Sequence, residues 1–370
     1  MTADRALLVT NDFPPRRGGI QSFLHELAIR LPPDRLAVYC SDHPGSAEFD
    51  AAQPFPVVRA STSMLLPTPG RTGEAVELAR RFGARTVWFG AAAPLGLMAP
   101  ALRARADVQH VVATTHGHET GWALLPGARG LLRRIGRDAD VVTYLSGYTR
   151  DRLASLLTGV RLEQLAPGVD VDTFSPSVDG AAVRQRWALG DAPTVVCVSR
   201  LVPRKGQDVL VAVWPQVREA VPDARLLLVG GGRTESTLRR RAGDGVVLTG
   251  LVDAGELPAH YAAGDVFAMP CRTRRGGLDV EGLGIVFLEG SATGLPVIVG
   301  DSGGAPDAVR DGETGILLDG RDHDAVAAAV IVLLRDAAVR RRMGAAGRAW
   351  VTADWTYDAA AARLAELLEL

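Results

Sequence analysis

The sequence predicts an α/β protein built from two Rossmann-like, doubly wound domains with parallel sheets. Three observations lead to this prediction. Short β-rich apolar runs alternate with amphipathic stretches of helical period along the chain. The same alternation begins again after Pro176. The length of 370 residues also exceeds the roughly 250–300 residues that a single core usually serves.

Strands are expected where apolar and β-branched residues cluster between turn residues. In the first half these are Ala6–Thr10, Leu36–Ser41, Thr86–Phe89, Val111–Thr115 and Val141–Leu145. In the second half they are Thr194–Ser199, Arg225–Val229, Val246–Thr249, Val266–Met269, Val297–Val299 and Gly315–Leu318.

Helices are expected between these strands, where the apolar positions recur with helical period. The clearest are Ile20–Leu31, Gly73–Phe82, Gln207–Ala220, Thr234–Arg241, Leu257–Ala262 and Asp324–Arg335, with an amphipathic tail at Tyr357–Leu370. Two such domains that meet at the carboxyl ends of their strands would form a cleft, where open α/β sheets bind ligands.

The Gly- and Pro-rich segment 168–176 interrupts the periodicity, so the domain boundary is expected there. We expect residues 1–170 to form the first domain and 171–350 the second, with 351–370 as a terminal segment. Asp170 and Asp172 resemble a metal-binding D-x-D pair. Because they lie in this linker, we interpret them as turn residues.

The composition excludes several classes of protein. A net charge of −1 argues against nucleic-acid binding, which usually needs a strongly basic domain. The three cysteines are scattered, as in a protein of a reducing compartment. The most apolar stretch, Val87–Leu102, contains Pro94 and is shorter than the roughly 18 apolar residues of a membrane span. We therefore expect a cytoplasmic protein, at most peripheral on the inner face of the cell membrane.

Lys205 is the only lysine among 41 basic residues, and it follows an expected strand. A lysine offers a compact charge and an arginine offers a planar fork. Together with Arg200, Lys205 therefore suggests a clamp for a diphosphate. The alternative is a solvated loop charge.

Gly18 and Gly19 lie between the first strand and the first helix. Glycines at a helix start let backbone amides approach an anion, which predicts a diphosphate cradle. The alternative is a turn that needs a positive φ. The cluster Gly230–Gly232 is likewise either a phosphate contact or a tight turn, since neither segment matches G-x-G-x-x-G.

Two histidines and a carboxylate lie together at His116, His118 and Glu119, after another strand. The spacing is not that of a helical zinc site, so we favour a substrate contact over a metal site or a capping role.

Two glutamates, Glu281 and Glu289, lie eight positions apart around a glycine loop that precedes a helix beginning at Ile285. Carboxylates that flank backbone N–H groups suit a ligand with several hydroxyls and an anion. The alternative is a pair of solvated glutamates.

Taken together and in this order, these motifs resemble the retaining glycosyltransferases of the GT-B fold, of the family 4 type. The resemblance covers nearly the whole chain. Several stretches are most similar to GDP-mannose-dependent phosphatidylinositol mannosyltransferases, in particular those that act on the monomannoside: residues 8–20, 116–122, 199–208 and 276–284. One departure is Leu283, where many relatives have Phe, which puts the fit of the sugar in question.

The resemblance implies a role for each matching residue. Gly18 and Gly19 would contact the donor diphosphate, and His118 would lie beside the transferred sugar. Arg200 and Lys205 would neutralise the leaving diphosphate. The sugar hydroxyls would be held by Glu281 with Gly282, Leu283, Gly284 and Ile285. Glu289 would hold the ribose, and the base would lie along Leu251 and Val252.

It also implies a terminal helix that packs back toward the first domain, which would be the acceptor side. The donor would be a nucleotide sugar, GDP-mannose above all, and the acceptor a lipid or a sugar. No tightly bound cofactor or obligatory metal is expected. A basic, partly apolar stretch at residues 127–137, with Arg80, Arg81 and residues 64–66, suggests contact with an anionic membrane surface; the alternative is a packed helix with solvated arginines.

Three other functions remain open at this stage. One is a GT-B glycosyltransferase with another nucleotide sugar and a soluble acceptor. Another is a protein that binds nucleotide sugars without turning them over. The third, a nicotinamide oxidoreductase, is disfavoured by the missing dinucleotide fingerprint.

Overall fold

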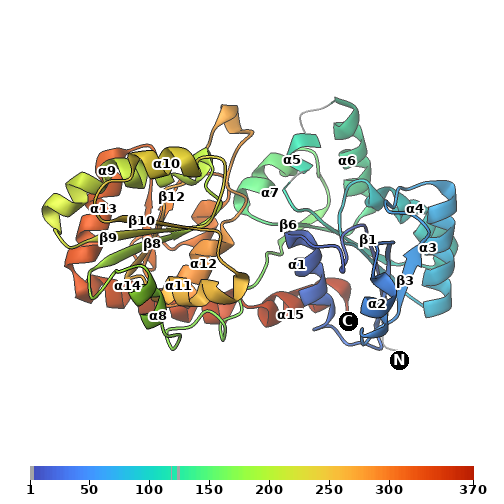
Figure 1. Cartoon of the computed structure of the whole chain (residues 1–370). Helices are drawn as coiled ribbons and strands as arrows, with labels where there is room; N and C mark the ends of the chain where they lie inside the picture. Colours follow the sequence, from blue (N-terminus) through green and yellow to red (C-terminus); the bar gives the residue numbers. More distant parts are fainter. Residues whose placement is uncertain (1–3, 118, 123–125) are drawn as a thin grey trace. The chain divides into compact units, whose positions relative to one another are not determined.

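A computed structural model of the chain describes residues 4–117, 119–122 and 126–370 (Figure 1). The chain divides into two compact units. The first contains Met1–Gly168 and Tyr357–Leu370, and the second contains Val169–Thr356. Residues 351–354, which the sequence assigned to a terminal segment, still belong to helix α14 of the second unit.

The first unit is built on a seven-stranded sheet in the order β3-β2-β1-β4-β5-β6-β7, with every neighbouring pair parallel. The strands are β1 (Ala6–Thr10), β2 (Leu36–Ser41), β3 (Val57–Ala60), β4 (Thr86–Phe89), β5 (His110–Thr114), β6 (Val141–Tyr144) and β7 (Arg161–Gln164). The α-helices are α1 (Gly19–Ala28), α2 (Ser46–Ala51), α3 (Pro69–Phe82), α4 (Ala99–Ala106), α5 (Glu119–Trp122), α6 (Pro126–Asp138), α7 (Gly147–Ala154) and α15 (Tyr357–Leu368).

Helices cover both faces of this sheet, as the alternating pattern predicted. Side chains of a strand alternate between the faces, so Leu7 and Val9 of β1 join one apolar cluster while Leu8 joins the other. The second cluster includes the buried face of α15, which lies beside α1 (Figure 1). The terminal helix therefore packs on the first unit.

The second unit is built on a six-stranded parallel sheet in the order β10-β9-β8-β11-β12-β13. The strands are β8 (Thr194–Val198), β9 (Arg225–Val229), β10 (Val246–Gly250), β11 (Val266–Met269), β12 (Val297–Gly300) and β13 (Gly315–Leu318). The α-helices are α8 (Ala181–Arg186), α9 (Gln207–Ala220), α10 (Glu235–Arg241), α11 (Leu257–Ala262), α12 (Ile285–Ala292), α13 (His323–Arg335) and α14 (Ala337–Asp354).

A few elements differ from the expectation. Strands β3 and β7 were not expected. Helix α1 ends at Ala28 instead of Leu31, because Pro32 and Pro33 follow and the residue before a proline disfavours helix. Helix α3 begins earlier, at Pro69, where the Thr68 hydroxyl accepts a hydrogen bond from the Arg71 amide.

In each sheet the strand order reverses at the strand that comes first in sequence. In the second unit β8 lies between β9 and β11. Loops that leave β8 and β11 at their carboxyl ends therefore flank a topological switch point, the usual ligand position in an open α/β sheet. The first of these loops contains Lys205, and the second contains Glu281.

Candidate functional site

Lys205 lies after β8, in a short 3-10 helix (Pro203–Lys205), and its side chain is only 9% exposed. Its Nζ lies 2.7 Å from Oε2 of Glu281, whose side chain is 8% exposed. Burying an unpaired ammonium costs far more free energy than burying one beside a carboxylate. The lone lysine is therefore one half of a buried ion pair, and its interpretation as a solvated loop charge is wrong.

The loop that carries Lys205 is held tightly. Gly206 has a φ of 78°, and a Cβ there would lie 2.0 Å from the carbonyl oxygen of Pro270, so this position requires glycine. The Gln207 side-chain amide donates to Ser199 Oγ at 2.6 Å and to the Arg200 carbonyl at 3.1 Å. The Gln207 bonds hold the loop after β8 together, and the Arg272 amide, which donates to the Arg204 carbonyl at 2.8 Å, joins it to the loop after β11.

Two arginines accompany Lys205. Arg200 is exposed, and within the described part of the chain its guanidinium has no carboxylate partner. Arg204 is partly buried, with Nη1 3.7 Å from Asp279 and Nε 3.8 Å from Glu281. Arg204 was not among the residues predicted from the sequence, although its position next to Lys205 was a usable signal. The carboxyl end of β8 thus carries three cations, one of them unpaired.

Glu281 is anchored through its backbone. Its amide donates to Ser302 Oγ at 3.3 Å, and its carbonyl accepts from the Gly304 amide at 2.9 Å. A Cβ at Gly303 would lie 2.1 Å from that carbonyl oxygen. The loop after β12 therefore holds Glu281 in place, and the alternative of a solvated glutamate is wrong here.

The residues between Glu281 and α12 form a tight turn. Gly282 is exposed, Leu283 is buried, and Gly284 precedes α12 with a φ of 81°. The first amides of α12 therefore begin beside Glu281, where the helix N-terminus favours negative charge.

Glu289 lies one turn into α12, and its Oε2 accepts a hydrogen bond of 2.5 Å from the Tyr261 hydroxyl. Burial raises the pKa of the Glu289 carboxyl, although the bond from Tyr261 opposes this rise. Burial, with the nearby carboxylate, also raises the pKa of Tyr261 well above its ordinary value. The phenol therefore keeps its proton and donates a hydrogen bond to Glu289. Glu289 is only partly exposed and is bound by Tyr261, so the alternative of a solvated glutamate does not hold at this position.

The remaining predicted positions of the second unit have contrasting environments. Leu251, after β10, is 84% exposed, and Val252 is half-buried. At Gly230 and Gly232 a Cβ would lie 2.2 Å from the Ser199 carbonyl oxygen and 2.4 Å from the Leu201 carbonyl oxygen, respectively. This close backbone approach supports the tight-turn interpretation of the glycine cluster.

In the first unit, Gly18 and Gly19 lie at the start of α1 and are exposed. Gly18 has an extended φ of 165°, and Gly19 is not among the positive-φ glycines. The alternative of a turn that needs a positive φ is therefore wrong. A Cβ at Gly19 would meet no atom within 4 Å, so packing does not explain the absence of a side chain there.

His116 is held by hydrogen bonds within the first unit. Its Nε2 lies 2.5 Å from the Gly90 carbonyl oxygen, and its amide donates to Glu119 Oε2 at 3.0 Å. His118 lies outside the described residues. Within the described ranges, no group of three or more His, Cys, Asp or Glu side chains is arranged to hold a metal ion.

The Asp170 carboxylate accepts hydrogen bonds from the amides of Asp172 and Thr173, each at 3.0 Å. This is the turn chemistry predicted for the linker.

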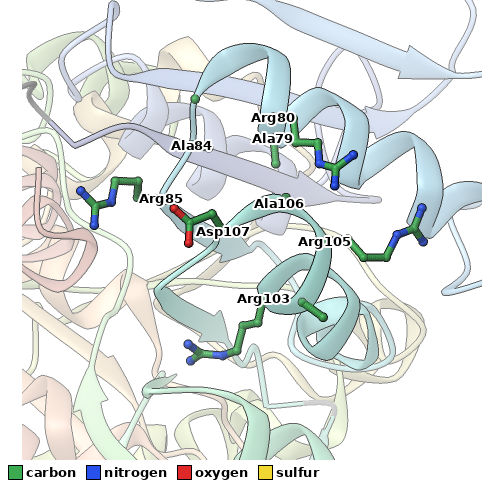
Figure 2. Close-up of a pocket in the computed structure, with 10 residues that line it drawn as sticks. Ala79, Arg80, Ala84, Arg85, Arg103, Arg105, Ala106 and Asp107 are labelled. Carbon is green, nitrogen blue, oxygen red and sulfur yellow. The ribbon is translucent and has the colours of Figure 1, made fainter.

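A basic pocket of about 530 Å³ in the first unit lies at the amino ends of the strands, opposite the carboxyl ends that carry the predicted residues (Figure 2). Arg85 precedes β4 and Asp107 precedes β5, so the pocket faces the amino ends of the strands. Arg80 and Arg103 belong to the last turns of α3 and α4, where cations stabilise a helix C-terminus. Figure 2 shows the side chains of Arg85 and Arg105 pointing to opposite sides. We do not assign this pocket to the site.

Comparison with known proteins identifies the family. Residues 17–173 match the model described as Glycosyltransferase Family 4, and residues 192–336 match Glycosyl transferases group 1. The chain is 53% identical over 373 residues to a GDP-mannose-dependent alpha-(1-6)-phosphatidylinositol monomannoside mannosyltransferase of Mycolicibacterium smegmatis, covering 98% of this chain and 97% of the relative. The chain belongs to glycosyltransferase family 4.

Other family 4 relatives and solved structures agree. A mannosyltransferase of Corynebacterium glutamicum, named for a monoacylated form of the same acceptor, is 46% identical over 100% of this chain and 99% of its own. Two solved structures share the fold: Anabaena HepE with UDP (TM-score 0.76, 19% identity, 98% and 99% coverage) and sucrose-phosphate synthase of Thermosynechococcus elongatus (TM-score 0.71, 22% identity, 98% of both chains).

The comparisons confirm the predicted glycosyltransferase family and the GT-B fold class with two Rossmann-like sheets. They contradict the nicotinamide oxidoreductase alternative. Every helix within the described residues is too short or too polar to serve as a membrane span.

Proposed function

We propose that this chain transfers a mannosyl group from GDP-mannose to a phosphatidylinositol monomannoside, with retention at the anomeric carbon. The observation that carries the proposal is the buried Lys205–Glu281 pair beside the exposed Arg200, at the switch point of the second sheet. It occurs in a chain that is 53% identical, over 98% of its length, to a relative named for this reaction.

In the proposed donor complex, Arg200 and Lys205 bind the diphosphate. Glu281 and the amides of Gly282–Gly284 hold the hydroxyls of the sugar, and Glu289 holds those of the ribose. The base lies along Leu251 and Val252, where an exposed apolar side chain is available for contact.

From the first unit, the Gly18 and Gly19 amides add donors to the diphosphate, and His118 contacts the transferred sugar. Both assignments rest on the family resemblance; the exposed, side-chain-free start of α1 supports the first.

The reaction breaks the bond between the sugar's anomeric carbon and the diphosphate oxygen. An acceptor hydroxyl forms the new bond on the same face, and its proton passes to the departing phosphate oxygen. Negative charge grows on the diphosphate as the bond breaks, and cations already in place stabilise it without reorganisation. Both glutamates are assigned to hydroxyls, so no enzymic nucleophile takes part.

For the acceptor we propose a polar pocket of about 600 Å³ in the first unit, at the carboxyl ends of β2 and β3. Asp42, Ser46 and residues 61–63 line it. Hydrogen bonds from Ser46 and the His43 amide lower the pKa of Asp42, which keeps the carboxylate ionised and able to accept from polyol hydroxyls.

We also propose that α6 lies against an anionic membrane surface on the cytoplasmic side. Leu132 and Ile135 are buried, while Arg129, Arg133 and the other arginines of the helix are exposed. The helix therefore packs on its own unit and presents a basic face that anionic headgroups attract.

Two measurements test the proposed reaction. Calorimetric titration with GDP, UDP and ADP identifies the base, and GDP is expected to bind most tightly. Transfer from GDP-mannose to phosphatidylinositol monomannoside, assayed with and without excess EDTA, tests the acceptor and the expected independence of a metal. Transfer only to a soluble sugar would favour the first alternative, and binding without turnover would favour the second.

A further inference from the structure

Glu289 has an unusual environment for a carboxylate. It is only partly exposed in the second unit, and the Tyr261 hydroxyl is the side-chain partner that the described residues provide. A partly buried carboxylate without a cation is costly, and its place in a protein is more often functional than stabilising.

Tyr261 itself is held rigidly. Its side chain is fully buried in α11 and stacks on Phe267 of β11, with ring centroids 5.5 Å apart at 20°. Phe174 meets its ring edge-on at 5.5 Å and 89°. Phe267 in turn packs at 5.7 Å against Phe287, which lies on α12 with Glu289. The aromatic cluster therefore fixes the phenol relative to the helix that carries the carboxylate.

We propose that Tyr261 is a positioning residue for the donor nucleotide: it occupies Oε2 of Glu289 and so turns Oε1 toward the ribose hydroxyls. The inference rests on the proposed contact between Glu289 and the ribose. An ionised carboxylate accepts at both oxygens, so one can be held by the protein while the other accepts from a ligand.

Packing alone does not explain the hydroxyl group. Phenylalanine would make the same ring contacts with Phe174 and Phe267 without burying a polar atom. The hydroxyl contacts Glu289, and it removes the freedom of that side chain to rotate about its last bond. Restricting that rotation before the ligand arrives lowers the entropic cost of binding.

The test compares GDP with 2′,3′-dideoxy-GDP by calorimetry on the full-length protein. Wild type is expected to bind GDP more tightly than the dideoxy nucleotide. Tyr261→Phe is expected to weaken GDP binding about tenfold while leaving dideoxy-GDP nearly unchanged, since one hydrogen bond to a charged group is affected. Tyr39→Phe is the matched control, because Tyr39 is a buried tyrosine of the first unit that donates to Glu74. It should change neither affinity.

An equal loss for both nucleotides, or no loss for either, would overturn the role of Tyr261 while leaving the ribose contact standing. Equal affinity of wild type for both nucleotides would instead refute the ribose contact, and the inference with it. Should Tyr261→Phe not fold, ¹³C-tyrosine NMR on wild type replaces it. The Tyr261 Cζ signal must then shift more with GDP than with dideoxy-GDP, and equal shifts would count against the proposal.

Discussion

Lys205 Nζ and Glu281 Oε2 lie 2.7 Å apart, with both side chains less than a tenth exposed. From its loop position, the sequence predicts that Lys205→Ala lowers turnover by orders of magnitude and leaves the fold intact. Its burial changes the second half of that prediction. Removing one partner of a buried pair leaves the other charge unpaired, which typically lowers the free energy of unfolding by about 3–5 kcal/mol. We expect Lys205→Met to lose both turnover and a comparable free energy of unfolding, measured by urea denaturation.

The double variant Lys205→Met, Glu281→Gln separates the two effects. Without the stranded carboxylate it should regain most of the lost stability, while turnover stays absent. Lys205→Arg keeps the charge but changes the reach of the head group, and it should also lose activity. Wild-type turnover in Lys205→Arg would show that lysine has no special role at this position.

Arg200 should behave differently from Lys205, because it is exposed and has no carboxylate partner among the described residues. Arg200→Ala is expected to lower kcat by about 10²–10³-fold, the usual cost of losing one preorganised donor. Its melting temperature should stay within about a degree or two of wild type, as for most surface changes. Arg240→Ala, an exposed position on α10, is the control and should leave turnover unchanged. A kcat for Arg200→Ala equal to that of this control would remove Arg200 from the mechanism.

The sequence predicted the buried strands of both sheets and also the edge strands β10 and β13 of the second sheet, but it missed two edge strands of the first sheet. Strands such as β8 and β11 are fully buried, so they read as unbroken apolar runs. The two strands that were missed, β3 and β7, lie at the edges of the first sheet and are partly exposed. An edge strand pairs on one side only, so Arg161 and Glu163 are tolerated in β7 and obscure the pattern.

For the site, the sequence indicated which residues matter but not how they are paired. Lys205 and Glu281 were each recognised from local motifs. Their ion pair depends on the strand order, which brings the loop after β8 next to the loop after β11. Tyr261 was not recognised at all, because a tyrosine in a short amphipathic helix looks like a core residue. Its bond to Glu289 appears only once α11 and α12 are placed together.

Glu289 gives a prediction about pH. Burial raises its pKa in the folded protein, so on raising the pH the unfolded chain releases this proton first. Above the ordinary carboxyl pKa, the folded state therefore binds more protons than the unfolded chain. The free energy of unfolding falls as the pH rises from that value to the raised pKa of Glu289. Glu289→Gln removes this loss. We expect its melting temperature to exceed that of wild type at about pH 8 and the difference to shrink toward about pH 4.

Glu163 provides a control of opposite sign. Although it is partly buried, Arg161 and Arg363 hold the pKa of its carboxyl below its usual range. The ionised Glu163 carboxylate therefore stabilises the folded protein above the ordinary carboxyl pKa, and this stabilisation is lost on acidification. Glu163→Gln should accordingly lower the melting temperature at about pH 8. If the difference in melting temperature between Glu289→Gln and wild type does not change with pH, the pKa of Glu289 is not raised in the folded protein.

The basic face of α6 predicts a salt-sensitive interaction with membranes. Each basic residue near an anionic surface contributes about 1 kcal/mol, so changing Arg133, Arg134 and Arg137 to Gln should weaken binding to anionic vesicles about a hundredfold. Vesicle flotation at low and high salt measures this, and transfer to a water-soluble acceptor analogue should be unaffected. The matched control changes Arg240, Arg341 and Arg342, exposed arginines of the second unit, to Gln. If the control loses as much binding as the α6 variant, attraction depends on the total charge of the protein and not on this helix.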